Sequence, residues 1–198
     1  MTISAQDVKK LRDMTGAGMM DCKKALSETD GDLDKAVDLL RARGAAKAAK
    51  RAEKAANEGT IGSYVHFDGR TAVIVEVNCE TDFVAKTDDL RGLAKELALH
   101  IASSAPLAVS PDEIAPEVIE RERKVYLEQA REEGKPDHIA EKIVEGRLNK
   151  FFKESTLLAQ PFVKDPDKTI EQLITETSAK TGEKIEVARF ARFRVGER

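Results

Sequence analysis

The chain has 198 residues, a formal net charge of −3 and a charged fraction of 35%. A charge this close to zero argues against a dedicated nucleic-acid-binding protein, because such proteins neutralise phosphates with an excess of Lys and Arg. Hydrophobic residues make up 41% without any run of about 18, and no signal-peptide pattern opens the chain, so we expect a helix-rich cytoplasmic protein without a membrane span.

Residues 1–44 are predicted to form a bundle of three short helices. Ser4 and Asp7 have the spacing of a capping box at the start of the first helix, and the glycines of residues 15–18 end it. Asp32 is a suitable N-cap for the third helix, which we expect to end at Gly44.

Two adjacent methionines, Met19 and Met20, follow the glycine-containing loop. Successive helical residues point about 100° apart, so the two side chains cannot easily both face one small core. Two interpretations remain open at this stage. Both methionines fill irregular gaps in the core, or at least one is exposed for adaptable contacts with another protein.

A basic, alanine-rich stretch covers residues 41–56, and we interpret residues 45–58 as an exposed helical linker. An alternative is that this stretch is a basic arm that binds RNA or the ribosome. The absence of aromatic residues for base stacking favours the linker, since a run of charge is most often a solvated face.

Residues 59–198 are predicted to form an α+β core, because strands and helices are segregated along this part of the chain. Asp68-Gly69 between two alternating segments predicts a β-hairpin. The remaining expected elements are an amphipathic helix at 88–104, a helical hairpin at about 116–154, a loop at 160–166, a helix at 169–181 and a third strand at 185–195 that joins the hairpin as an antiparallel sheet.

The segment Thr81-Asp82-Phe83-Val84 follows the second predicted strand and carries a large aromatic residue into a loop or short helical turn. Phe83 either folds back to cover the core or is held out as an anchor for a partner's pocket. The usual burial of aromatic side chains favours the first interpretation when these residues are considered alone.

No common catalytic motif occurs, and His66, His100 and His138 share no functional spacing, so no catalytic residue, cofactor or metal site is expected. The two cysteines, Cys22 and Cys79, are expected to be reduced thiols. An enzyme with Cys79 as its nucleophile is a further class of function, but no paired base is found near it in sequence.

Two stretches of the chain resemble the signatures of the bacterial elongation factor Ts family: residues 11–26, LRDMTGAGMMDCKKAL, and residues 76–86, EVNCETDFVAK. Residues 134–136, 141–147 and 160–163 resemble further stretches of the family, so the similarity extends over nearly the whole chain. The resemblance implies a ubiquitin-associated-like N-terminal bundle. It also implies a protein that is not an enzyme but a guanine-nucleotide exchange factor, which binds elongation factor Tu with GDP and promotes GDP release.

The resemblance also assigns roles to single residues. It implies that Met19 and Met20 contact the GTPase from the bundle. Thr81, Asp82, Phe83 and Val84 would disturb the partner's magnesium and phosphate site, which reverses the interpretation of Phe83 as a cover for the core.

Chain length bears on the oligomeric state, because 198 residues leave room for one core and similarly short members of the family act as homodimers. We therefore expect a homodimer built on the core. Neither a membrane nor a nucleic acid is expected as a direct partner.

Overall fold

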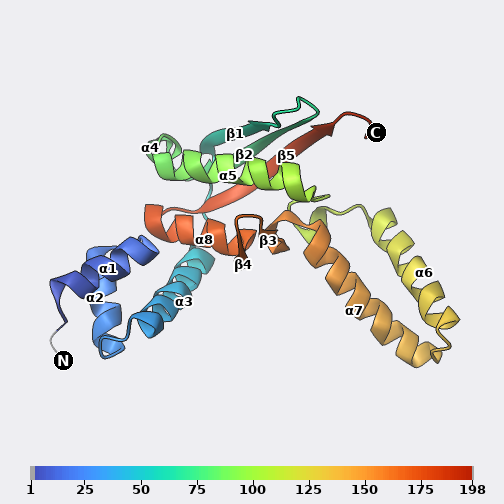
Figure 1. The fold of residues 1–198 in the computed structure, drawn as a ribbon, viewed down its shortest axis with the longest axis horizontal. Helices are drawn as coiled ribbons and strands as arrows, with labels where there is room; N and C mark the ends of the chain where they lie inside the picture. The colour runs from blue at the N-terminus through green and yellow to red at the C-terminus, as the bar shows by residue number, and fades with distance from the viewer. Residues whose placement is uncertain (1–2, 198) are drawn as a thin grey trace.

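The computed structural model describes residues 3–197 (Figure 1). A helical bundle lies against one of the helices that cover a three-stranded antiparallel sheet, and a helical hairpin extends away from that sheet. The predicted α+β fold is therefore confirmed. In the part of the chain that is described, no helix is long and apolar enough to cross a membrane.

The N-terminal bundle contains α1 (Ala5–Thr15), α2 (Met19–Glu28) and α3 (Leu33–Arg51). The predicted capping box is present, since the backbone N–H of Asp7 donates to Ser4 Oγ at 3.1 Å and the Asp7 carboxylate accepts from Ser4. The bundle has a small core of its own, made of Val8, Leu11, Cys22, Ala25, Leu26 and Ala36.

The predicted end of the third helix at Gly44 is wrong, because α3 continues without a break to Arg51. Gly44 is buried where α3 crosses α8 (Ile170–Thr181), and a Cβ added to it would lie 3.5 Å from the Cβ of Ala179. Here glycine allows close packing of two helices, and the following Ala and Lys residues favour continued helix. The predicted boundary between bundle and linker thus falls inside one helix, and the division of the chain into domains stays a prediction.

The central sheet has the strand order β1-β2-β5, with β1 (Glu58–Val65), β2 (Thr71–Cys79) and β5 (Ile185–Arg194) all antiparallel. The predicted hairpin turn is confirmed, and Gly69 adopts the positive φ of 68° that the turn requires. The predicted third strand is confirmed as well. It pairs with β2, which is therefore the central strand.

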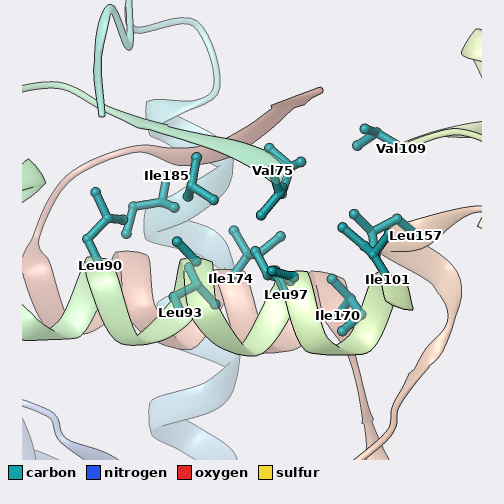
Figure 2. Packing of buried hydrophobic residues seen from close by; sticks show 14 of the residues in the cluster. Val75, Leu90, Leu93, Leu97, Ile101, Val109, Leu157, Ile170, Ile174 and Ile185 are labelled. Carbon is teal, nitrogen blue, oxygen red and sulfur yellow. The ribbon is translucent and has the colours of Figure 1, made fainter. Parts of the chain in front are cut away.

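One face of the sheet is covered by α5 (Asp88–Ser104) and α8 (Figure 1). Helix α5 presents Leu90, Leu93, Leu97 and Ile101 to β2 and α8, as Figure 2 shows. Strand β1 approaches α5 so closely at Gly62 that an added Cβ would lie 2.2 Å from the carbonyl oxygen of Ala94. Any larger residue would separate the strand from the helix.

The predicted helical hairpin is confirmed as α6 (Pro116–Glu132) and α7 (Asp137–Ser155). Its apolar seam is narrow and is built from Ala130, Ala140, Val144 and Leu148. The expected loop at 160–166 is instead a small two-stranded sheet of β3 (Pro161–Phe162) and β4 (Asp165–Thr169). Phe162 is buried in the main core, and its burial holds this segment in place. Short 3₁₀ helices lie at Pro111–Glu113 and Leu157–Ala159.

Candidate partner-binding site at α4

The segment singled out from the sequence forms α4 (Asp82–Ala85), a single helical turn between β2 and α5. Thr81 is its N-cap and accepts a hydrogen bond from the backbone N–H of Val84 at 3.4 Å. Thr87 caps the start of α5 two residues after α4 ends. The turn is thus held between the central strand of the sheet and α5, the helix that packs on that sheet.

Phe83 is exposed over 78% of its surface, and its neighbour Val84 is exposed over only 5%. Val84 and Ala85 belong to the main hydrophobic core, so they fix the inner side of the turn. The interpretation of Phe83 as a cover for the core is therefore wrong. A rigid aromatic ring that projects from a fixed backbone is suited to insertion into a partner's pocket.

Acidic side chains around α4 are paired with lysines. The Asp82 carboxylate lies 2.6 Å from Lys86 Nζ, and the Glu80 carboxylate lies 2.6 Å from Lys54 Nζ. Hydrogen bonds from these lysines hold the pKa of each carboxyl below its ordinary value. Both acids are thus ionised at neutral pH, and their negative charge is partly balanced within the site.

The loop that leads into α4 is bound to a carboxylate from a distant part of the chain. Glu183, in the turn between α8 and β5, accepts hydrogen bonds from the backbone N–H groups of Glu80 and Thr81 at 3.1 and 3.0 Å. More than 100 positions separate the partners in sequence, so periodicity gives no signal for this contact. Glu183 was not identified from the sequence.

Met19 and Met20, at the start of α2, are 47% and 76% exposed. The interpretation that both fill gaps in the bundle core is therefore wrong. Helix α2 packs against α1 and α3, whereas α4 packs against β1, β2 and α5, so the methionines form a second surface, separate from α4. Both surfaces lie at the end of the molecule opposite the α6–α7 hairpin (Figure 1).

Several basic side chains of residues 41–56 contact acidic groups of the same chain, which reduces the charge available to a phosphate backbone. The pairs are Arg41 with Glu176, Arg43 with Glu28, Lys47 with Asp21 and Lys54 with Glu80. The alternative of a basic RNA-binding arm gains no support from this arrangement.

Cys79 is fully buried, its thiol donates to the carbonyl oxygen of Thr81 at 3.1 Å, and burial raises its pKa. A protonated, enclosed thiol is a poor nucleophile, which argues against Cys79 chemistry. Cys22 is also buried, and burial raises its pKa in the same way. Within residues 3–197, no group of three or more His, Cys, Asp or Glu side chains is arranged to hold a metal ion.

The sequence of this chain is similar to known proteins over nearly its whole length. A sequence model of the family described as Elongation factor TS matches residues 6–197. The chain is 56% identical over 196 residues to elongation factor Ts of Syntrophobacter fumaroxidans, a match that covers 99% of this chain and 98% of that protein.

Two further relatives match to a similar extent. The chain is 54% identical over 197 residues to elongation factor Ts of Geobacter sulfurreducens, covering 100% of this chain and 91% of that protein. It is 55% identical over 195 residues to elongation factor Ts of Desulforamulus reducens, covering 98% and 90% of the two chains. The chain therefore belongs to the elongation factor Ts family of translation elongation factors.

Proposed function

We propose that this protein is a guanine-nucleotide exchange factor that binds elongation factor Tu with GDP in the cytoplasm and promotes GDP release. The observation that carries the proposal is the exposure of Phe83, 78%, on a turn whose next two side chains, Val84 and Ala85, are buried in the core. The ring is thus free to enter a partner while its backbone stays fixed. The function requires binding alone, so the protein forms and breaks no covalent bond and needs no cofactor.

The physical basis of exchange is competition for the contacts that hold GDP. A GTPase binds its nucleotide through backbone amides around the phosphates and through Mg²⁺. An aromatic ring wedged beside that site displaces groups that these contacts need. Asp82, next to Phe83, would bring a negative charge toward the phosphates, which adds repulsion of GDP.

Exchange then follows from thermodynamic linkage. If binding of the factor weakens the affinity for GDP, GDP weakens the affinity for the factor by the same free energy, and each 1.4 kcal/mol is about a tenfold change. The factor therefore leaves once GTP has filled the emptied site. Its own structure need not change during the cycle.

The N-terminal bundle supplies a second contact in this proposal. Met20 is exposed over 76% of its surface, and the thioether chain of methionine adapts to irregular apolar surfaces. Contacts at Met19 and Met20 would contribute affinity, whereas contacts at α4 would act on the nucleotide. We expect this bundle to be of the ubiquitin-associated-like kind.

Stopped-flow release of a fluorescent GDP from elongation factor Tu tests the proposal. Wild-type protein should accelerate release, and Phe83→Ala should lose most of that acceleration at saturating concentration. Phe67→Ala is a matched control, because Phe67 is 93% exposed but lies beyond Val65, at the opposite end of β1–β2 from α4. No acceleration by the wild-type chain would contradict the assignment.

We also propose that the protein acts as a homodimer through the uncovered face of its sheet. Alternation along β2 turns Val73, Val75 and Val77 to the core and Ile74 to solvent, where it is 53% exposed. Phe193 of β5 pairs with Ala72 and is 68% exposed on the same face. A sheet face with exposed apolar side chains from adjacent strands can pack on its own copy around a two-fold axis, which supports this interface.

A further inference from the structure

The turn between α8 and β5 places the Glu183 carboxylate against the loop that precedes α4. One oxygen, Oε2, accepts from the backbone N–H groups of Glu80 and Thr81 at 3.1 and 3.0 Å. The other oxygen, Oε1, accepts from the hydroxyl of Thr81 at 2.6 Å. A single side chain thus binds three donors on two successive residues.

The Thr81 hydroxyl connects this contact to the exposed turn. It has one hydrogen, which it donates to Glu183, so its oxygen remains free to accept from the backbone N–H of Val84 at 3.4 Å. That second bond is the N-cap of α4. The direction of the Thr81 hydroxyl, and with it the first turn around Phe83, is therefore set by Glu183.

Glu80 completes a reciprocal arrangement between the same two segments. Its Oε1 accepts from the backbone N–H of Lys184 at 2.7 Å, while its Oε2 contacts Lys54 Nζ at 2.6 Å. Lys184 Nζ in turn donates to the carbonyl oxygen of Lys54 at 3.1 Å. Glu183 thus binds the backbone of the β2–α4 loop, and Glu80 binds the backbone just before β5. Together the two carboxylates fasten the loop to the start of β5.

The turn that carries Glu183 is itself fixed. Gly182 ends α8 with a φ of 81°, and the hydroxyl of Ser178 donates to the Glu183 carbonyl oxygen at 2.5 Å. A four-residue helix has no stability of its own, because helix nucleation is unfavourable over so short a length. Its position therefore depends on two anchors: the burial of Val84 on the inner side and the Glu183 hydrogen bonds at its start.

We infer that Glu183 is a positioning residue for nucleotide exchange, which holds Thr81 and the α4 turn so that Phe83 enters the partner in one fixed orientation. The inference rests on the proposed exchange function. Glu183 acts through the loop and not by contact with the nucleotide. Its loss should therefore lower the maximal rate of GDP release much more than the affinity for the partner.

The test uses the full-length Glu183→Gln variant, which keeps the side-chain shape but replaces one acceptor oxygen with an NH₂ group. Two measurements are made. Hydrogen–deuterium exchange of the protein alone should show at least about tenfold faster exchange at the amides of Glu80 and Thr81, because a neutral amide oxygen is a weaker acceptor than the carboxylate and the NH₂ group cannot accept from the Thr81 hydroxyl. Stopped-flow GDP release should show a maximal rate reduced by about tenfold and a half-saturating concentration changed by less than about threefold.

Three further variants make the result specific. Glu171→Gln removes the same charge at an exposed position in the first turn of α8, at the opposite end of that helix from Glu183, and it should leave both measurements unchanged. Glu183→Asp keeps the charge but is shorter by one methylene, so its carboxylate reaches the loop less well and the maximal rate should also fall. This variant replaces Glu183→Gln in the test if the Gln variant does not fold. Combined with Phe83→Ala, Glu183→Gln should cause little additional loss, because it acts through Phe83.

The outcomes separate this inference from the function on which it rests. If wild-type protein fails to accelerate GDP release, the exchange function is wrong, whatever the amide measurement shows. If wild-type protein is active and Glu183→Gln loosens the two amides without a change in maximal rate, the positioning role is wrong. Unchanged amide exchange in a folded variant would also overturn it.

Discussion

Phe83 and Val84 are consecutive residues of α4 that face opposite environments, with exposed fractions of 78% and 5%. Within one turn of helix, Val84 is thus buried in the protein and Phe83 is exposed to solvent. Val84 fastens the turn to the core, and Phe83 stays exposed, where it can make the proposed contact with a partner. Substitutions at the two positions should separate stability from activity.

Val84→Ala should lower the free energy of unfolding by about 1–3 kcal/mol, because it removes two buried methyl groups from the main core. Phe83→Ala should change the same quantity by less than about 0.5 kcal/mol, since the ring is mostly exposed. Urea denaturation monitored by circular dichroism measures both. An equally large loss of stability in the two variants would mean that Phe83 also supports the fold.

Asp82→Asn should slow GDP release at saturating factor by about two- to fivefold, because an exposed charge contributes up to about 1 kcal/mol. Lys86→Met should have the opposite effect, since it leaves the Asp82 charge without the ammonium group that now lies 2.6 Å away. Stopped-flow kinetics at low and high salt measure both changes. Asp112→Asn, at an exposed position in the Pro111–Glu113 turn, is the control. Equal release rates for the wild type and all three variants would exclude an effect of the Asp82 charge.

Gly62→Ala should destabilise the protein by about 3 kcal/mol, because the new Cβ would lie 2.2 Å from the Ala94 carbonyl oxygen and would push β1 away from α5. Gly92→Ala, a chemically identical change on the exposed side of α5, should stabilise by about 0.5–1 kcal/mol, since alanine favours helix and meets no neighbour. Thermal and urea unfolding measure the pair. A tolerated Gly62→Ala would show that the strand and helix can separate at little cost.

His100 should make stability depend on pH. The residue is fully buried, Val163 N–H donates to its Nδ1 at 3.2 Å, and its Nε2 lies 3.0 Å from Gln160 Oε1, so the neutral ring satisfies both contacts. Burial lowers its pKa below the ordinary 6.5. The unfolded chain therefore takes up a proton first as pH falls.

The stabilising contribution of neutral His100 is complete above pH 6.5 and declines below it, by at most about 1.4 kcal/mol per pH unit, until the lower pKa of the folded protein is reached. Denaturant midpoints measured between pH 7.5 and 5 should show this slope. His100→Gln should remove it, whereas His138→Gln, at an exposed position, should keep it. The same slope in wild type and His100→Gln would assign the effect to other groups.

Ile74→Lys should dissociate the proposed homodimer, because it brings a charge into the centre of the uncovered sheet face. Light scattering at micromolar concentration should give twice the chain mass of 21.8 kDa for wild type and the single-chain mass for the variant. Leu107→Lys, at a 62% exposed position outside the sheet, is the control and should stay dimeric. A stable wild-type monomer would contradict the interface.

Much of the fold could be predicted because its signals are local. Gly69 fixes the turn of the β1–β2 hairpin, and Ser4 with Asp7 marks the start of α1. The repeat of Leu90, Leu93, Leu97 and Ile101 identifies the buried side of α5. Each of these features depends on residues within a few positions of one another, where steric limits and side-chain period act without knowledge of the rest of the chain.

The errors occur where a distant contact outweighs the local signal. Gly44 was expected to end a helix, but Ala179 of α8 packs against it and the helix continues. Residues 160–166 have the prolines of a loop, yet burial of Phe162 draws them into a small sheet. At residues 160–166 tertiary packing outweighs the local preference for a loop, whereas at Gly44 the Ala and Lys residues that follow also favour helix and the glycine allows α3 to pack closely on α8.

The sequence by itself determined which residues are available at the site: an aromatic and an acid between a strand and a helix, in a stretch that identifies the family. Only the tertiary structure decided that Phe83 points outward, because that direction depends on the core that holds Val84 and on the Glu183 carboxylate that binds Thr81. These contacts join segments about 100 residues apart. Local periodicity cannot encode them, because they exist only once the sheet and α8 have come together.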